Sequence, residues 1–457
     1  MENISIILSA GIGKRMHSSL PKVMHPICGR PMVQYAIDAA KDVTDKVIVV
    51  ISNKIDKSIF KDVTIAYQDV PLGTGDATKS ALNAIKDASD DARILILTGD
   101  NPLIKSSDLK SFLSYCNEKD SDAALLTAVA ENPEGFGRII RNKEEFVRIV
   151  EEKDATEEEK KIKEINTGIY VFKKKYLSYS LQKITPNNAQ KEYYLTDALS
   201  ILKDVGIKIN VKKLERSLPV YGVNNRKELS LATKIIQQEI LDRLMLKGVT
   251  ILNPETVSID YNVVIGNDTV ILPNVLIEGE TKIGNGCTIG PNTRITDALI
   301  GNGTDVQFSV IIQSEIGENC TIGPFSYIRP GNRMSKNVKI GTFVEVKKSH
   351  FGEDTKVPHL SYIGDATIGK NVNIGAGTIT CNYSGLEGKK KNPTFIEDNV
   401  FIGSNNTLVA PVKIKKGAYT AAGSVITEDV PESALAIGRA RQVNKENWVK
   451  RRKKDNG

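Results

Sequence analysis

The second half of the chain repeats itself every six residues, from about residue 249 to residue 425. Isoleucines recur in one column at this spacing, which begins with Ile265, Ile271, Ile277, Ile283, Ile289 and Ile295. The period is too long for the turn of a helix, about 3.6 residues, and for the alternation of a strand, about 2 residues. It suits a short strand followed by a turn, with one apolar residue of each side pointing inward and Gly, Asn or Asp at the corner.

Three such sides make one triangular coil, and coils have to stack because a single coil cannot bury its own apolar column. Successive coils then pair as parallel strands about 4.8 Å apart. The stretch therefore predicts an all-β rod of roughly ten coils. A β-sandwich is the alternative, but its turns, about 8–12 residues apart, have no reason to keep a period of six.

The whole chain of 457 residues is too long for one hydrophobic core, so two or three domains are expected. Its net charge of +7 suits small anionic ligands as well as nucleic acid and decides little between them. No basic segment precedes the apolar residues at the start, and no apolar run is long enough to cross a membrane. The five cysteines are scattered, which indicates a reducing, cytoplasmic location and argues against disulfides and zinc.

The first half alternates buried strands, such as Ile4–Leu8, Lys46–Ile51 and a strand from Arg93 that ends in Asp100, with helices. This order predicts a doubly wound, Rossmann-like α/β domain. A Gly-rich turn, Ser9–Met16, follows the first strand and offers backbone N–H groups to phosphate oxygens. By itself the turn is weak evidence, because it lacks the third Gly of a dinucleotide site and the Gly-Lys-Ser/Thr end of a Walker loop.

A family resemblance becomes specific where several motifs follow one another in order. The segment Leu8–Met16 with Leu20-Pro-Lys22 resembles the opening signature of sugar-nucleotide pyrophosphorylases. The family's later motifs correspond to Leu72–Gly75, Gly99–Pro102, Gly135–Arg138, Ile149–Asp154, Ile165–Gly168 and Gly222–Asn225. With the rod, residues 3–450 resemble the bacterial bifunctional enzymes that are both N-acetylglucosamine-1-phosphate uridylyltransferases and glucosamine-1-phosphate N-acetyltransferases.

The resemblance implies an α/β domain followed by an all-β domain. A Rossmann-like pyrophosphorylase domain is expected at residues 1–225 and a linker helix at residues 226–248. A left-handed parallel β-helix with acetyltransferase activity is expected at residues 249–439, followed by a basic tail at residues 440–457. The left hand is a property of the family and does not follow from the period.

The resemblance also implies the residues of the uridylyltransferase site. Arg15 and Lys22 correspond to the catalytic phosphate contacts, and Asp100 and Asn224 to the ligands of Mg²⁺. Contacts with UTP and UDP-N-acetylglucosamine correspond to Leu8, Ala10, Gly11, Lys22, Gln68, Gly73, Thr74, Gly137, Glu151, Asn166 and Asn224. The chain departs from the family pattern near these residues at Ser9, Lys14, Asp76 and Thr98.

The rod is expected to carry the second active site. The resemblance makes His359 the general base that takes a proton from the amine of glucosamine 1-phosphate as it attacks acetyl-CoA. It implies contacts with glucosamine 1-phosphate at Arg329, Lys347, Tyr362 and Asn373. It implies contacts with acetyl-CoA at Ala376, Asn382, Tyr383, Ser404, Ala422 and Arg439. His350 matches no role, and we expect it to be structural.

Two irregularities favour a second task for the rod. The column is expected to break between Ile328 and Ile340, which are twelve residues apart with polar residues between them, and to be disturbed again at residues 341–349, 357–364 and 380–384. The segment Gly385–Thr394 is longer than the corresponding loop of the family. Its lysines 389–391 either meet the phosphates of CoA or form a solvated loop.

Two alternatives remain open from the sequence. A single-function sugar-1-phosphate nucleotidylyltransferase would use the rod only to oligomerise, and a regulatory scaffold would keep both folds without either activity. The bifunctional interpretation predicts UDP-N-acetylglucosamine synthesis for peptidoglycan and lipopolysaccharide precursors, with UTP, acetyl-CoA and Mg²⁺. It also implies a homotrimer whose basic tails cover neighbouring CoA sites, without a nucleic-acid or membrane partner.

Overall fold

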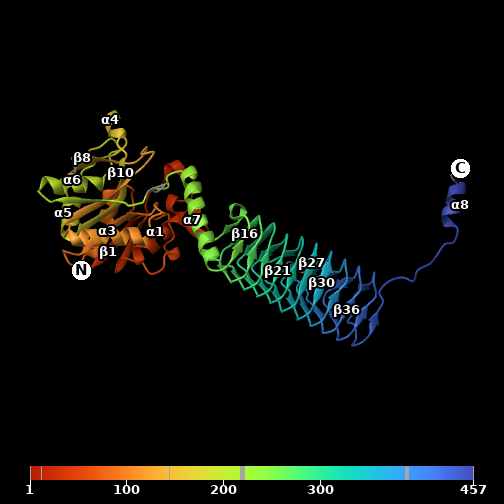
Figure 1. Cartoon of the computed structure of the whole chain (residues 1–457). Coiled ribbons are helices and arrows are strands. Elements are labelled where there is room, and N and C mark those ends of the chain that lie inside the picture. The colour runs from red at the N-terminus through yellow and green to blue at the C-terminus, as the bar shows by residue number, and fades with distance from the viewer. Residues whose placement is uncertain (1, 12, 144, 217–221, 386–390, 456–457) are drawn as a thin grey trace. The chain divides into compact units, whose positions relative to one another are not determined.

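The computed structural model describes residues 2–11, 13–143, 145–216, 222–385 and 391–455. They form two compact units, one ending at Ile236 and one beginning at Gln237. The first unit is an α/β domain, and the second is an all-β rod followed by a tail (Figure 1). The predicted fold class is confirmed.

A nine-stranded sheet forms the centre of the first unit, with the main path β11-β7-β10-β6-β1-β4-β5 and the hairpin β8–β9 attached to β10. Its strands are β1 (Asn3–Leu8), β4 (Lys46–Ile51), β5 (Thr64–Tyr67), β6 (Arg93–Thr98), β7 (Ala123–Val129), β8 (Arg138–Asn142), β9 (Glu145–Val150), β10 (Glu164–Lys173) and β11 (Ile209–Lys213). A separate small sheet pairs β2 (Pro26–Ile27) with β3 (Arg30–Pro31). β10 runs antiparallel to β6 and β7, whereas β1, β4, β5 and β6 are parallel to one another. These four parallel strands therefore end at the same edge.

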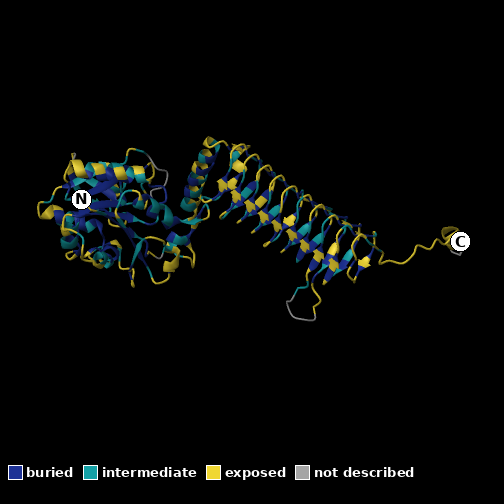
Figure 2. Ribbon diagram, turned by 90° about the horizontal axis from the view of Figure 1, so that it is seen from below, coloured by how far each residue is buried: buried dark blue, intermediate teal, exposed yellow. Residues whose placement is uncertain are grey.

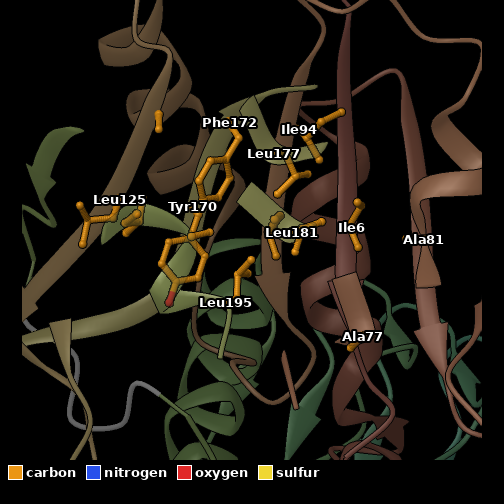
Figure 3. Packing of buried hydrophobic residues seen from close by; sticks show 14 of the residues in the cluster. Ile6, Ala77, Ala81, Ile94, Leu125, Tyr170, Phe172, Leu177, Leu181 and Leu195 are labelled. Atoms are coloured by element: carbon orange, nitrogen blue, oxygen red, sulfur yellow. The ribbon is translucent and has the colours of Figure 1, made fainter. Parts of the chain in front are cut away.

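Helices cover both faces of this sheet. They are α1 (Met32–Lys41), α2 (Thr74–Ser80), α3 (Ser106–Glu118), α4 (Glu157–Lys160), α5 (Lys174–Leu181) and α6 (Thr196–Asp204). Successive residues of β1 supply two different cores: Ile6 packs with residues of α2, α5 and α6, and Ile7 with residues of α1 and α3. Figure 3 shows the first core, where Leu177 and Leu181 of α5 lie near Ile94 and Ile6 of the sheet. Burial on both faces explains why these strands are continuously apolar in the sequence.

The rod has three faces, each of which is a parallel sheet. The chain visits them in rotation, and we call them sheets C, D and E. Sheet C has 11 strands from β12 (Thr250–Ile251) to β41 (Leu435–Ala436), sheet D has 10 from β13 (Ser258–Ile259) to β40 (Val425–Ile426), and sheet E has 9 from β14 (Val264–Ile265) to β38 (Val412–Ile414). Inward residues pair coil to coil, as Ile271 does with Ile289, and Figure 2 shows buried and exposed positions alternating along the faces. The predicted rod of roughly ten coils is confirmed.

The predicted break of the column between Ile328 and Ile340 is wrong. Met334, on β26 (Arg333–Met334), occupies the inward position midway between them, pairs with Ile316 and is 5% exposed. An unbranched thioether side chain fills the core there in place of isoleucine or valine. Among the described residues the column is interrupted after Thr380 on β34 (Ile379–Cys381), where residues 380–384 were expected to disturb it, and Ile396 resumes it by pairing with Ile368.

The boundary between the two units falls within α7 (Arg226–Leu246). The second half of α7 contacts the first coils, where Gln237 Nε2 donates to the backbone oxygen of Ile259 (3.2 Å) and Arg243 to that of Tyr261 (3.1 Å). The tail contains α8 (Trp448–Asp455). Among the described residues, no helix has the length and hydropathy needed to cross a membrane.

Candidate active sites

The first candidate site lies at the carboxyl edge of the four parallel strands. β1 ends at Leu8 and leads into the turn that contains Ala10, which is buried, and Gly11, which is exposed. Gly99 N donates to Leu8 O (2.9 Å), and Gln68 N donates to the last residue of β4 (3.0 Å). The residues that follow β1, β5 and β6 therefore lie along one edge, where open α/β sheets bind ligands.

Four predicted residues form one polar cluster at this edge. Arg15 Nη2 donates to Asn224 Oδ1 (2.9 Å), and Lys22 Nζ donates to the same oxygen (3.2 Å). Lys22 also forms an ion pair with Asp100. The backbone fixes the arrangement, because Val223 N donates to Asp100 O (2.8 Å). Residues as far as 209 positions apart in the sequence therefore meet, as the resemblance implies.

The cluster controls the charge of Asp100. Burial alone would raise the pKa of this carboxyl, but the adjacent Lys22 ammonium and hydrogen bonds from Lys22 and Thr98 hold the pKa below its ordinary value. Asp100 is therefore ionised at neutral pH. Thr98, one of the departures from the family pattern, acts here as a hydrogen-bond donor to this carboxylate.

The first Gly-rich turn requires glycine at one point. Gly13 has a φ of 68°, and a Cβ at this position would lie 2.5 Å from Lys22 Cβ. Lys14 is exposed at the start of the short 3₁₀ helix η1 (Lys14–Met16), so this departure adds a cation without displacing the turn's packing. Ser9 is buried next to Gly99. A Cβ on residue 99 would collide with the Ser9 hydroxyl.

The second Gly-rich turn is fixed to a distant segment. Gly73 has a φ of 119°, and a Cβ there would lie 2.5 Å from Tyr193 O. Leu195 N donates to Thr74 Oγ1 (3.0 Å) at the start of α2. Gln68 is 4% exposed, and its Nε2 donates to Gly73 O (3.2 Å). The three predicted nucleotide contacts of this region therefore lie together.

The predicted sugar contacts also lie together. Asn166 N donates to Gly137 O (2.8 Å), and Asn166 Nδ2 donates to Tyr170 OH (2.7 Å). A Cβ on Gly137 would lie 3.4 Å from both carboxylate oxygens of Glu151. Glycine at 137 therefore leaves space in front of the Glu151 carboxylate.

Glu151 is a partly buried acid with an unusual titration. Burial, together with the nearby carboxylates of Asp197 and Asp154, raises its pKa to about 7 even though the hydrogen bond from Thr196 lowers it. Thr196 Oγ1 lies 3.4 Å from Glu151 Oε1. The carboxyl group is therefore about half protonated at neutral pH.

The second candidate site lies on the rod and begins with a column of residues at the corner after sheet C. β30 (Lys356–His359) pairs with β33 (Asn373–Ile374), β33 with β36 (Phe401–Ile402), and β36 with β39 (Tyr419–Thr420). Extending these pairings by two or three residues aligns the positions that we call the corner column: His359, Ala376, Ser404 and Ala422. The corner is hydrogen-bonded coil to coil, since Asn405 N donates to Ala376 O (2.6 Å). Arg439 lies one coil further on, with its Cδ 3.6 Å from where a Cβ of Gly423 would be.

Sheet D carries most of the predicted contacts for glucosamine 1-phosphate. Ile328 pairs with Val346, so Arg329 and Lys347, which each follow by one residue, occupy the same position in successive coils. Arg329 Nη1 donates to Glu345 Oε1 (2.9 Å), and Glu345 pairs with Tyr362 of the next coil. These side chains share one face of the rod, whereas Asn373 lies on sheet C, beyond the corner column.

The residues after Thr380 border this face. Asn382 is 5% exposed and donates to Asp365 Oδ2 (2.6 Å) and to Tyr362 OH (3.4 Å). Tyr383 is exposed, and Lys391 Nζ lies 3.7 Å from the centre of its ring. Lysines 389 and 390 of the long loop lie outside the described residues.

His359 is exposed at the end of β30, and its imidazole accepts or donates no hydrogen bond among the described residues. His350, expected to be structural, is also exposed and lies on sheet E in β29 (His350–Phe351). His359 and His350 are therefore both exposed, but His359 lies at the end of a sheet C strand and His350 lies on sheet E.

Sequence reasoning missed three residues of the first site. Tyr170 accepts a hydrogen bond from Asn166, and Thr196 donates one to Glu151. The positions of Tyr170 and Thr196 in the sequence do not predict these hydrogen bonds. Asp76 accepts a hydrogen bond from Gln68 Nε2 (2.7 Å). Asp76 carried a signal, because it stands where the family pattern usually has histidine.

Both units match known families. Residues 4–208 match the family described as Nucleotidyl transferase. Residues 262–297 match the family described as Bacterial transferase hexapeptide, and residues 393–428 the one described as Hexapeptide repeat of succinyl-transferase. Fold and sites thus define a class, in which a nucleotidyltransferase is joined to a hexapeptide-repeat transferase.

Relatives along the entire chain carry the name Bifunctional protein GlmU. The protein of Carboxydothermus hydrogenoformans is 50% identical over 97% of this chain and 99% of its own length. The protein of Caldanaerobacter subterraneus subsp. tengcongensis is 50% identical over 99% of this chain and 98% of its own length. The protein of Thermoanaerobacter pseudethanolicus is 51% identical over 98% of this chain and 98% of its own length. The chain belongs to the family of the bifunctional protein GlmU.

Family membership confirms the bifunctional interpretation. The chain is an enzyme of UDP-N-acetylglucosamine synthesis, a uridylyltransferase in its nucleotidyltransferase half and a glucosamine-1-phosphate N-acetyltransferase in its hexapeptide half. The relatives match both halves end to end, so a single-function enzyme and an inactive scaffold are set aside.

Proposed function

We propose that the cluster of Arg15, Lys22, Asp100 and Asn224 is the uridylyl-transfer site. An oxygen of N-acetylglucosamine 1-phosphate attacks the α-phosphorus of UTP, the bond to the β-phosphate breaks, and pyrophosphate leaves. Arg15 and Lys22 would neutralise the phosphate charge, Arg as a planar fork and Lys as a point charge. The observation that carries this assignment is the convergence of both cations on one amide oxygen.

The same cluster suits Mg²⁺. A carboxylate oxygen of Asp100 and the amide oxygen of Asn224 both face Lys22 Nζ, so two hard oxygen ligands already converge on a cation. Among the described residues no group of three His, Cys, Asp or Glu side chains is placed to hold a metal, so phosphates and waters would supply the other ligands. When bound, Mg²⁺ would offset the charge of the phosphates.

We assign the sugar end of this site to Gly137, Glu151 and Asn166. The space in front of Glu151 and the amide of Asn166 suit hydroxyl and acetamido groups, which both donate and accept hydrogen bonds. Gln68 and the turn at Gly73–Thr74 lie together after β5, where they would meet the uracil base.

We assign acetyl transfer to the corner column and sheet D. The amine nitrogen of glucosamine 1-phosphate forms a bond to the acetyl carbonyl carbon, the carbon–sulfur bond breaks, and CoA leaves as the thiol. His359 would take the proton of the amine, and Arg329 and Lys347 would bind the sugar phosphate. The small residues Ala376 and Ala422 keep the corner free of bulk along the rod, which suits the extended pantetheine arm of CoA.

We propose further that the enzyme is a homotrimer in which neighbouring chains complete the acetyl-transfer site. Phe308, Phe325 and Phe343 form a ladder beside the corner column, with ring centres 5.4 Å apart at each step. Phe325 is 53% and Phe343 59% exposed, and all three have φ values of 47–59°, which bulky residues rarely adopt. An exposed apolar ladder held outward in this way supports contact with another chain.

The two halves of the proposal are tested with glucosamine 1-phosphate, acetyl-CoA, UTP and Mg²⁺. Free CoA is expected without UTP, and pyrophosphate only with it. His359→Ala should abolish CoA release and spare pyrophosphate release from N-acetylglucosamine 1-phosphate, and Asp100→Ala should do the reverse. His350→Ala is the matched control and should spare both. CoA release by His359→Ala at the wild-type rate would refute the assignment of the base.

A further inference from the structure

We infer that Asp76 is a specificity-determining residue that fixes the amide of Gln68 so that only its oxygen faces the nucleotide base. The inference rests on the proposed contact between Gln68 and the uracil of UTP. The inference identifies the residues that discriminate between uracil and cytosine. It also assigns a role to a residue that no motif accounts for.

The first step concerns the orientation of the amide. Gln68 is 4% exposed, and its Nε2 donates to two acceptors, Gly73 O (3.2 Å) and Asp76 Oδ2 (2.7 Å). An amide nitrogen has two hydrogens, so both are used. A carbonyl and a carboxylate accept and do not donate, so rotating the amide by half a turn would set oxygen against oxygen at both positions. The orientation is therefore dictated by chemistry.

The second step concerns the group that remains. Among the described residues, Gln68 Oε1 accepts no hydrogen bond, although the rest of the side chain is held on both sides. An oxygen fixed in this way accepts and does not donate. It matches the N3–H of uracil, which is a donor, and it opposes the N3 of cytosine, which is an acceptor.

The third step concerns why Asp76 performs this task. Asp76 lies in the first turn of α2, where backbone N–H groups favour a negative charge. Gly75 N donates to Tyr193 O (2.8 Å), which holds this turn in place beside Gln68. A charged acceptor makes a stronger hydrogen bond than the Gly73 carbonyl does. Removing the charge therefore weakens the larger of the two constraints.

The test compares kcat/KM for UTP and CTP, each measured on the same preparation of the full-length enzyme. Asp76→Asn should lower the UTP/CTP ratio about tenfold, because the new amide can donate to a reversed Gln68. Asp76→Glu, which keeps an acceptor, should retain most of the ratio. Asp69→Asn is the matched control, since Asp69 is exposed and binds Asn53 instead (2.9 Å). CoA release by the rod reports the amount of enzyme in each preparation, and the ratio itself does not depend on how much of the first unit is folded.

A second background separates the inference from the function on which it rests. In Gln68→Ala the ratio should fall, and adding Asp76→Asn should lower it no further, because Asp76 acts through Gln68. An unchanged ratio in Asp76→Asn, with a lowered ratio in Gln68→Ala, would overturn the role of Asp76 alone. An unchanged ratio in Gln68→Ala would overturn the proposed base contact, and the inference with it.

Discussion

Glu151→Gln should stabilise the first unit at alkaline pH and not at acidic pH. Burial, with the charges of Asp197 and Asp154, raises the pKa of Glu151 from 4.5 to about 7. At 1.36 kcal/mol per pKa unit, ionising this group in the folded protein costs about 3 kcal/mol relative to the unfolded chain. The folded state holds its proton more tightly, so stability falls as pH rises from the unfolded pKa toward 7 and then levels off.

Glutamine has the same shape and no charge to bury. The variant should therefore gain about 3 kcal/mol at pH 8 and less than about 1 kcal/mol at pH 5. For a unit of this size, this corresponds to a melting temperature higher by roughly 6–12 °C at pH 8. Differential scanning calorimetry of the full chain at both pH values measures this, and the calorimetric transition that shifts belongs to the first unit.

Glu145→Gln is the matched control, because it makes the same chemical change at the exposed start of β9, the strand that Glu151 follows. It should leave both transitions unchanged. A gain for Glu151→Gln that is equal at pH 5 and pH 8 would refute the reasoning, since it would have nothing to do with ionisation. Pyrophosphate release should fall in Glu151→Gln if Glu151 contacts the sugar. A substitution that raises stability would then lower activity at this position.

Three further predictions concern other parts of the chain. Gly13→Ala should abolish pyrophosphate release and spare CoA release in the two coupled assays, because its Cβ would lie 2.5 Å from Lys22 Cβ at a positive φ. Met334→Ala should destabilise the rod by about 2–5 kcal/mol in urea unfolding, because it empties an inward position, whereas the exposed Ser335→Ala should not. Phe343→Glu should lower the mass measured by light scattering from trimer towards monomer and reduce CoA release, with pyrophosphate release unchanged. A trimer that persists in this variant would remove the ladder from the proposed interface.

The six-residue column predicted the rod because a solenoid repeats one local solution, so that each side can be recognised in isolation. It misjudged Met334, since an inward residue of another type looks like a gap when only isoleucine and valine are counted. The strands of the first unit were predictable because continuous apolar runs follow from burial on both faces.

The sites were less accessible from spacing alone. Arg15 and Asn224 are 209 residues apart and meet through the order of the strands, so only the family resemblance joined them in advance. The burial that changes the pKa of Glu151 depends on the packing around it and leaves no local pattern. The corner column follows from the period only in part, because Ala376 comes 17 residues after His359 and Ser404 comes 28 residues after Ala376, whereas three sides of six make 18.

The corner column also makes the length of the second site adjustable in fixed steps. His359 and Ala422 are three coils apart, or about 14 Å at the spacing of parallel strands. Deleting or duplicating one complete coil between them would change this separation by about 4.8 Å and leave every remaining inward contact paired. The length of the rod between two such positions is therefore set by the number of whole coils and not by the packing of the core.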